Sequence, residues 1–393
     1  MAEILKNRRD ERTELIVLGS TGSIGQQTLE VVRALPKEFR IVALSARRNI
    51  KLLKEQMDEF KPLRVAVTDE DAAAALCSGT KIPVFRGKHA QVDVCSGDSG
   101  DVVVNAIVGM AGIEPTLFAL SHWKTVALAN KETIVSAGKL VMDMAHQHQT
   151  QLIPVDSEPS AIYQCLQGQR DKSIKRLILT ASGGPFRNAS LEKMRMASVE
   201  DTLAHPTWSM GEKISVDSAT MMNKGFEVIE AMHLFNLPSY KIDVVVHPQS
   251  IIHSLVEFVD HSTLAQLGFP DMRVPIQYAI SGGVRHANNY AQLDLVGIGQ
   301  LTFEYPSPTK FPCLQLARQA AEKGATYPAV LNAANDFLVG MFLRREIPLT
   351  SIAKGVEYVL SMHEPITGDY TLGDIYDIRD WVRGLLQSYR LSL

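Results

Sequence analysis

The chain is poor in cysteine and carries little excess charge. Four cysteines, at positions 77, 95, 165 and 313, occur in 393 residues, and no two of them form a CxxC motif. This spacing excludes a disulfide framework and a cysteine-based zinc site, and it favours a reducing compartment. The net charge of −3 provides no broad basic surface for nucleic acid or an anionic membrane. Any phosphate binding must therefore depend on local basic residues.

Long hydrophobic runs are also lacking. The longest, around residues 102–113, is too short to span a bilayer and is interrupted by Asn105. The first residues, MAEILKNRRDERTEL, are charged where a signal peptide needs an apolar core, and Arg8-Arg9 lacks the apolar run of a twin-arginine signal. The length exceeds what one hydrophobic core usually supports. We expect a cytoplasmic protein of two or three domains that binds neither membrane nor nucleic acid.

The first 150 residues have the pattern of a nucleotide-binding fold. Residues 15–18 form a short apolar strand, GSTGSIG follows at 19–25, and a helix (26–35) and a second strand (41–44) come next. Glycines at the first turn of such a βαβ unit let a pyrophosphate approach the helix N-terminus, although a tight turn without ligand is the alternative. Strands at 64–68, 102–108 and 125–129 alternate with helices at 69–76, 115–120 and 133–147. We predict a Rossmann-type domain at 1–150.

The end of the second strand indicates which dinucleotide binds. An NAD site usually has a carboxylate there, whereas this chain has Arg47, Arg48 and Asn49. Two arginines can pair with a 2′-phosphate, and a merely solvated arginine pair is the plain alternative. The sequence therefore favours NADPH.

Asn130, Lys131 and Glu132 follow the strand at 125–129. Polar residues at the carboxyl end of a strand lie where open α/β sheets bind ligands. The triplet also suits the start of the next helix. A lysine at that edge is well placed to meet substrate or nicotinamide.

A pair of carboxylates follows the apolar segment 151–155. Residues two apart in an extended segment face the same way, so Asp156 and Glu158 can point together. Two such carboxylates repel each other unless a cation lies between them, and oxygen ligands suit Mg²⁺ or Mn²⁺. Asp156 and Ser157 could equally cap a helix. Taken alone, this segment leaves metal site and helix cap about even.

The strand at 177–180 is followed by Ser182 and two glycines. Exposed backbone N–H groups beside a hydroxyl form an anion nest, and a simple turn is about as plausible.

The segment 204–231 gathers polar side chains before and at the start of an amphipathic helix. His205, Ser218, Asn223 and Lys224 are donors of the kind that clamp a phosphate. Glu227 lies on the same helix face as Asn223 and could complete a metal shell. Apolar cover and a mobile loop would come from Trp208, Met210 and Gly211. Met222, Phe226 and Ile229 follow helical spacing and belong to the core.

Together these segments make the chain resemble the 1-deoxy-D-xylulose 5-phosphate reductoisomerase family. The matching segments occur in the family's order along almost the whole length of the chain. The matching segments are GSTGSIG (19–25), ALANKE (127–132), PVDSE (154–158), SGGPF (182–186), HPTWSMGEKISVDSATMMNKG (205–225), VVVHPQSIIHS (244–254), LAQLGFPDMR (264–273) and LNAAN (331–335). The long central segment makes the match very specific.

The resemblance implies roles for individual residues. The metal ligands would be Asp156, Glu158 and Glu227, and Lys131 or Glu158 could shuttle protons. The substrate would contact Lys131, Ser157, Glu158, Ser182, His205, Trp208, Ser218, Asn223, Lys224 and Glu227, with Trp208 and Met210 on a lid. NADPH would contact Gly19, Thr21, Gly22, Ser23, Ile24, Arg47, Arg48, Asn49, Asn130, Glu132 and Gly211.

The implied reaction is skeletal isomerisation of 1-deoxy-D-xylulose 5-phosphate followed by reduction with NADPH to 2-C-methyl-D-erythritol 4-phosphate. The resemblance also implies Mg²⁺ or Mn²⁺, and a homodimer formed through a sheet of the catalytic domain. The rival interpretation is a metal-independent NADP-dependent dehydrogenase of a small phosphorylated substrate. A third hypothesis is an NADPH-sensing regulator with a degenerate site. The presence of every carboxylate and every phosphate donor named above argues against such degeneracy.

The expected architecture is α/β: a Rossmann-type NADPH domain (1–150), a catalytic and dimerisation domain (151–304) with strands at 244–258 and 262–268, a linker (305–312) and a C-terminal helical bundle (313–393). Two positions depart from the family pattern. Pro159 stands where a histidine is common, and the helix after LNAAN continues with Asp336 where glutamate is frequent. We expect the second departure to affect only dimer or domain packing.

Overall fold

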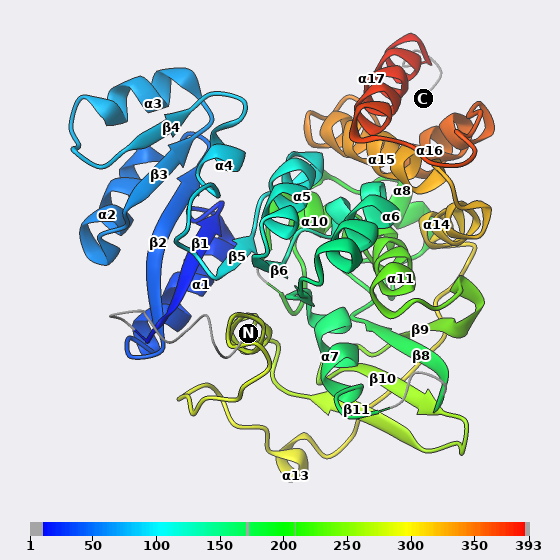
Figure 1. Cartoon of the computed structure of the whole chain (residues 1–393). Helices are drawn as coiled ribbons and strands as arrows, with labels where there is room; N and C mark the ends of the chain where they lie inside the picture. The colour runs from blue at the N-terminus through cyan, green and yellow to red at the C-terminus, as the bar shows by residue number, and fades with distance from the viewer. Residues whose placement is uncertain (1–10, 170–172, 209, 390–393) are drawn as a thin grey trace. The chain divides into compact units, whose positions relative to one another are not determined.

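The computed structural model describes residues 11–169, 173–208 and 210–389 (Figure 1). They form two compact units, each built from separate chain segments. The first unit comprises the chain up to Asn130 together with Asp143–Asp156 and Asp271–Asn289. The second comprises Lys131–Met142, Ser157–Pro270 and the chain from Tyr290 onward. The division into functional domains at 1–150, 151–304 and 313–393 stays a prediction.

A parallel seven-stranded sheet forms the first unit, in the order β4-β3-β2-β1-β5-β6-β7 (Figure 1). Helices cover both faces of such a sheet, so its strands are short continuous apolar runs, and Leu15 to Leu18 are fully buried. The predicted parallel α/β fold is confirmed. The strands are β1 (Thr13–Leu18), β2 (Phe39–Ala46), β3 (Arg64–Val67), β4 (Val84–Arg86), β5 (Val102–Asn105), β6 (Thr125–Leu128) and β7 (Leu152–Pro154).

The helices of this unit follow the strands in alternation. They are α1 (Ser23–Ala34), α2 (Ile50–Phe60), α3 (Glu70–Cys77), α4 (Ala90–Asp93), the 3₁₀ helix η2 (Gly109–Gly112), α5 (Ile113–Ser121) and α12 (Arg273–Ile280). Sequence patterns gave no expectation for α2, β4 or α12. Helix α12, although distant in sequence, packs against α1 and the strands β6 and β7. Helix α6 (Lys131–His148) is broken by non-helical torsions at Ala137.

A four-stranded sheet forms part of the second unit, in the order β11-β10-β8-β9 (Figure 1). Its strands are β8 (Ile174–Ala181), β9 (Ile242–Val246), β10 (Ile252–Phe258) and β11 (Thr263–Leu267). Strand β9 runs parallel to β8, whereas β10 is antiparallel to β8 and β11. The prediction of one strand at 244–258 is wrong, because a turn with Ser250 at a φ of +52° carries the chain from one side of β8 to the other.

Helices make up the rest of the second unit. Helices α7 (Ser157–Cys165) and α11 (Met222–Phe235) pack on the four-stranded sheet. Of the four predicted C-terminal helices, all are present: α14 (Pro312–Lys323), α15 (Tyr327–Leu343), α16 (Ser351–Ser361) and α17 (Leu372–Tyr389). The remaining elements are α8 (Leu191–Arg195), α9 (Val199–Leu203), α10 (Glu212–Thr220), η4 (Ser239–Lys241) and α13 (Leu295–Ile298). Among the described helices, none combines the length and apolarity needed to cross a bilayer.

Candidate active site

Two helices rather than one carry the polar segment at 204–231. Met221, in the left-handed conformation with a φ of +58°, ends α10 and precedes α11. Ser218 therefore lies on α10, whereas Asn223 and Glu227 lie in the first two turns of α11. The predicted core residues of α11, among them Phe226, are fully buried. This buried face fixes α11 against its neighbours, so the polar side chains of its first turns are held by a rigid support.

Three carboxylates converge where α7 and α11 begin. Asp156, Glu158 and Glu227 each offer an oxygen, and these oxygens lie within 4.8 Å of one another. Asp156 is joined directly to Ser157, the first residue of α7. Oxygen donors of this kind, without sulfur or imidazole, are those that Mg²⁺ and Mn²⁺ prefer. The residues present therefore fit a hard divalent cation. Glu158 reaches the cluster from the first turn of α7 and not from the extended segment that we expected from the sequence, and its role as a metal ligand stays a prediction.

Two buried lysines hold the carboxylates of this cluster. Lys131 Nζ donates to Asn223 Oδ1 at 2.6 Å and to Glu227 Oε1 at 3.1 Å. Lys224 Nζ donates to Glu158 Oε1 at 2.9 Å and to Glu227 Oε2 at 2.5 Å. Asn223 Nδ2 also donates to Glu227 Oε1 at 2.6 Å. Glu227 is fully buried, so these three donors compensate the cost of burying its charge.

The charges in this cluster are set by burial and by the partners. Burial lowers the pKa of Lys224, but Glu158 and Glu227 outweigh it, and the net pKa is raised. Burial raises the pKa of Glu158, but Lys224 and the hydroxyl of Ser157 outweigh it, and the net pKa is lowered. The ammonium group and the carboxylate therefore both stay charged at neutral pH, as metal binding and anion binding require.

Ser182 and His205 form a second polar pair in the same unit. His205 Nδ1 accepts from the backbone N–H groups of Thr207, at 3.2 Å, and of Trp208, at 2.9 Å. The proton of a neutral ring must then be on Nε2, which lies 3.0 Å from Ser182 Oγ and donates to it. Burial lowers the pKa of His205, which favours this neutral form. Ser182 Oγ also accepts from the N–H of Gly184 at 3.2 Å.

The loop before α10 carries the apolar cover. Trp208 and Met210 are half-buried, and Gly211 is exposed at the N-terminal end of α10. The Trp208 ring lies 6.4 Å from the ring of His253, a β10 residue for which we predicted no role. Burial lowers the pKa of His253, whereas the charge of Glu158 raises it, so the two residues are close enough to interact. The sequence signal for this histidine was its place in the matching segment VVVHPQSIIHS (244–254).

The glycine-rich turn in the first unit is tied to the neighbouring strand and helix. Ser45 Oγ accepts from the N–H of Gly19 at 2.9 Å. Gln56, buried on α2, donates to the carbonyl of Ser20 at 2.9 Å and accepts from its hydroxyl at 2.7 Å. A Cβ on Gly25 would lie 2.3 Å from the Gly19 carbonyl oxygen, so only glycine allows this close approach. The turn is therefore rigid and leads directly into α1, as the predicted pyrophosphate site requires.

Other predicted cofactor residues have partners within the protein. Arg47 and Arg48 are exposed after β2, and Arg48 Nε donates to Asp69 Oδ2 at 2.6 Å. Asn49 caps α2 by accepting from the N–H of Leu52 at 3.2 Å. The remaining predicted contacts divide between the units. Thr21, Gly22, Ser23 and Ile24 form the turn and the start of α1, Asn130 donates to the carbonyls of Ile107 and Gly109, and the carboxylate of Glu132 lies 2.8 Å from Lys213 Nζ.

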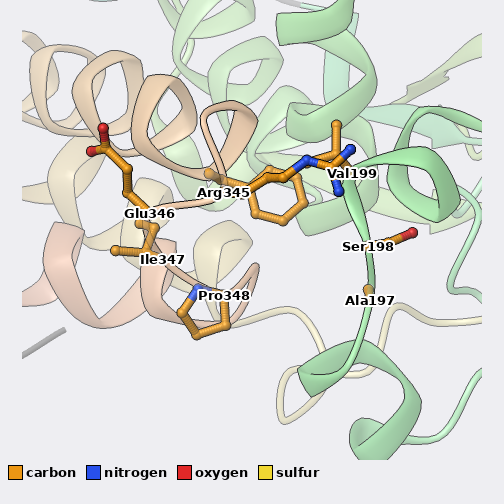
Figure 2. Close-up of a pocket in the computed structure, with 8 residues that line it drawn as sticks. Ala197, Ser198, Val199, Arg345, Glu346, Ile347 and Pro348 are labelled. Atoms are coloured by element: carbon orange, nitrogen blue, oxygen red, sulfur yellow. The ribbon is translucent and has the colours of Figure 1, made fainter.

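A separate hollow of about 340 Å³ lies between the α8–α9 connection and the end of α15 (Figure 2). Figure 2 shows Arg345 extending from the α15 side towards Val199. Arg345, at a φ of +61°, forms an ion pair with Glu200 of α9. None of the residues that line this hollow is a predicted site residue. The Arg345–Glu200 ion pair connects the segment after α15 to α9, which leads into the loop that carries His205.

Comparison with known families agrees with this geometry. A family model described as 1-deoxy-D-xylulose 5-phosphate reductoisomerase matches residues 15–138, and two models of reductoisomerase C-terminal domains match residues 152–235 and 267–385. A reductoisomerase of Chlorobium phaeobacteroides is 51% identical over 372 residues, 94% of this chain and 97% of that protein. One from Geotalea daltonii is 48% identical over 382 residues, 95% of this chain and 99% of that protein.

Solved structures give the same answer. The enzyme from Zymomonas mobilis in complex with NADPH has a TM-score of 0.90 at 41% identity, and the match covers 97% of this chain and all of that one. A reductoisomerase in complex with NADPH, fosmidomycin and magnesium has a TM-score of 0.91 at 41% identity, with 96% and 98% of the two chains covered. By sequence and by fold, the chain belongs to the 1-deoxy-D-xylulose 5-phosphate reductoisomerase family.

Proposed function

We propose that the chain converts 1-deoxy-D-xylulose 5-phosphate into 2-C-methyl-D-erythritol 4-phosphate, with NADPH and a divalent cation, as a step of non-mevalonate isoprenoid synthesis. The observation that carries the proposal is the convergence of Asp156, Glu158 and Glu227 within 4.8 Å, beside two buried lysines. A dehydrogenase that reduces a carbonyl directly needs no such carboxylate cluster. A rearrangement does, because charge develops on adjacent substrate oxygens as the carbon skeleton changes.

The metal and the cofactor would be held by different parts of the chain. Asp156, Glu158 and Glu227 would hold Mg²⁺ or Mn²⁺, while the turn at 19–25 and Arg47 and Arg48 would hold NADPH. When bound, the cation supplies Lewis acidity towards the substrate oxygens and NADPH supplies the hydride of the reduction. The magnesium and NADPH complexes of related reductoisomerases support both assignments.

Lys131 and Lys224 would orient and neutralise the substrate. Asn223 and Glu227 fix Lys131 Nζ in one position, so the ammonium group would meet a substrate oxygen without a search among rotamers. Its position next to a carboxylate also suits it to hold a proton that moves between substrate oxygens. Glu158 Oε2 accepts from the hydroxyl of Ser157 at 2.6 Å, and this carboxylate is the alternative proton carrier.

The phosphate would bind between two structural elements of the second unit. Ser182 and the backbone of Gly183 and Gly184 offer donors after β8, and Gly184 lies so close to α10 that a Cβ there would be 2.7 Å from the Ser218 carbonyl. Ser218, Asn223 and Lys224 offer donors from α10 and α11. Neutral His205 would donate from Nε2, which favours an anion without adding a permanent charge. The loop with Trp208 and Met210 would then exclude water.

Assembly and location are further parts of the proposal. We infer a homodimer formed through the sheet that ends in β11, an edge strand with Leu264 exposed. Sedimentation equilibrium at micromolar concentration tests it, and a monomer at every concentration would refute it. We infer a cytoplasmic location from the separated cysteines, and fractionation of the source cells tests it.

The deciding experiment is NADPH oxidation by the purified protein with 1-deoxy-D-xylulose 5-phosphate, during titration of Mg²⁺ into chelator-treated protein. We expect no oxidation without the cation and a branched-chain product with it, identified by NMR. Oxidation that survives complete cation removal, with an unrearranged product, would favour the metal-independent dehydrogenase. Binding of NADPH without oxidation under any condition would favour a regulator.

A further inference from the structure

A second ion cluster lies in the second unit, apart from the carboxylates described above. Lys213 Nζ lies 2.8 Å from Glu132 Oε1, 2.9 Å from Asp217 Oδ2 and 3.1 Å from Asp336 Oδ1. The side chains of Lys213, Glu132 and Asp217 are 18%, 12% and 3% exposed, and that of Asp336 is 32% exposed. These four residues, the Lys213 cluster, connect α6, α10 and α15. One ammonium group thus joins three helices that are far apart in sequence.

Members of the Lys213 cluster are covalent neighbours of predicted substrate residues. Glu132 follows Lys131 in the first turn of α6, and Asp217 precedes Ser218 on α10. A shift of either carboxylate therefore moves the backbone from which a substrate contact projects. Displacements below 1 Å in such a support lower catalytic rates strongly.

Helix α15 adds two buried hydrogen bonds to this support. Asn335 Nδ2 donates to Asp217 Oδ1 at 2.7 Å, and Asn332 Nδ2 donates to Ser136 Oγ of α6 at 2.8 Å. Both asparagines are fully buried. The family motif LNAAN, for which the sequence suggested no role, thus holds α6 and α10 from one side. Asp336 is the next residue, and it forms an ion pair with Lys213 of α10.

The charges of the Lys213 cluster are unbalanced. Burial lowers the pKa of Lys213, but Asp217, Asp336 and Glu132 outweigh it and hold the pKa well above the usual value. Burial raises the pKa of Asp336 to about 6. The negative charges of Glu132 and Asp217 also raise it, whereas the ammonium group of Lys213 lowers it. Lys213 also lies 5.2 Å from the Phe226 ring centre, on α11. Asp336 therefore changes charge between pH 5 and 7, while Lys213 stays an ammonium group.

A further titratable group that faces the cluster comes from α14, which packs against α10 and α15. Burial raises the pKa of Cys313 on α14 to about 12, with a further contribution from Asp217, so its thiol stays neutral across this range. For Glu132, burial raises the pKa, but Lys213 outweighs it and the net pKa is lowered. Among these groups, Asp336 is thus the one whose charge changes near pH 6.

We propose that the Lys213 cluster is a positioning device for the phosphosugar site, in which ionised Asp336 ties α15 to Lys213 and so fixes Lys131 and Ser218. This inference rests on the proposed function and deepens it. Its physical basis is that a third carboxylate restricts Lys213 to one position between α6 and α10. The repulsion among the three carboxylates costs stability, and the fold accepts this cost in exchange for a fixed site.

The test compares Asp336→Asn with the parent protein, because asparagine keeps the shape and removes the charge. The readout is the KM of Asp336→Asn for 1-deoxy-D-xylulose 5-phosphate divided by the KM of the parent protein, measured between pH 5.5 and 8.5. The substrate phosphate also titrates near pH 6, but its effect is common to both proteins and cancels in the ratio. We expect a ratio of roughly three to five at pH 8 that falls towards one at pH 5.5, where most of the Asp336 population is protonated. The dissociation constant of the phosphosugar, measured by calorimetry without NADPH, should change by the same ratio.

Two further measurements separate positioning from plain structural support. Because the pKa of Asp336 is raised in the fold, its contribution to stability is full below about pH 4 and is lost as the pH rises through about 6. Asp336→Asn should therefore leave Tm at pH 8 unchanged or raise it, while KM rises. Asp336→Glu, which restores the charge, should return the KM ratio towards one.

A control is available in an exposed ion pair between Lys139 of α6 and Asp369, which lies in the connection before α17. Asp369→Asn removes the Lys139–Asp369 ion pair, a lysine–aspartate contact of 3.0 Å that also involves α6, and should leave the KM ratio at one. A ratio for Asp336→Asn that does not vary with pH, or a Tm that falls as KM rises at every pH, would overturn the proposal. If Asp336→Asn failed to fold, Asp336→Ser would serve the same comparison. Absence of turnover in the parent protein would instead refute the proposed function, so the two failures are distinct.

Discussion

Replacing Glu227 by glutamine separates the metal site from the cofactor site. Glu227 is fully buried and accepts hydrogen bonds from Asn223, Lys131 and Lys224. Glutamine keeps the shape of the glutamate side chain but has a single acceptor oxygen. Its amide N–H₂ group would face N–H groups that now donate to Glu227. Lys224 retains Glu158 at 2.9 Å, so we expect a stability loss of about 1–3 kcal/mol, below the full cost of breaking a buried ion pair.

The effect on catalysis should be larger than the effect on stability. Loss of one of three anionic ligands weakens the stabilisation of charge on the substrate oxygens, by on the order of 4 kcal/mol, which is about a thousandfold in kcat. NADPH affinity should change less than about twofold, because the glycine-rich turn belongs to the first unit and Glu227 to the second. The assays are NADPH oxidation at saturating Mg²⁺ and fluorescence titration of NADPH.

Glu257→Gln is the matched control. Glu257 also accepts from two cationic side chains, Lys175 at 2.7 Å and Arg176 at 2.5 Å, but it lies on β10 outside the predicted site. Glu257→Gln should leave kcat within about twofold of the parent value. If Glu227→Gln retained more than a tenth of the turnover, the metal assignment would be wrong. An equal loss of NADPH binding would refute the separation of the two sites.

Other perturbations test the cofactor preference, the phosphate site and the pH dependence. Arg48→Asp should narrow the preference for NADPH over NADH by about tenfold or more, because it replaces a partner of the 2′-phosphate with a negative charge that repels it. The control Arg33→Asp breaks an exposed ion pair elsewhere in that unit and should leave the preference unchanged. An equal NADPH-to-NADH preference in the two variants would mean that the 2′-phosphate is bound elsewhere. Gly184→Ala should raise the KM for the phosphosugar at least several-fold, since this residue has a φ of +65° and a Cβ would lie 2.7 Å from the Ser218 carbonyl; an unchanged KM would exclude this turn from the phosphate site. Lys175 and Arg176 lower the pKa of Glu257 to about 2, so this group adds stability above about pH 4.5 that is lost as the pH falls towards 2, and the Tm difference between the parent and Glu257→Gln should disappear over that interval.

The sequence predicted local structure well wherever hydrophobic period and turn chemistry agree. Short apolar runs with glycines between them specified the parallel sheet, and the family resemblance is confirmed by the comparisons. The buried face of α11 followed from the helical spacing of its apolar residues. Local patterns failed where a break is small. The turn between β9 and β10 contains no glycine but does contain Pro248, a signal against one continuous strand that the prediction overlooked. Met221 adopts the left-handed conformation that sequence rules assign to glycine or asparagine.

The residue types of the site were determined by the sequence, whereas their convergence was decided by the tertiary structure. Local spacing could not distinguish a metal ligand from a helix cap at Asp156, because both uses require the same side chain in the same place. The distinction depends on Glu227, which only the packing of α7 and α11 brings close. Likewise nothing in the sequence pairs Lys213 with Asp336, and the motif LNAAN reads as an ordinary helix until α15 packs beside α10. Periodicity fixes which face of its own helix a residue occupies, but the partner of that face is chosen by long-range packing.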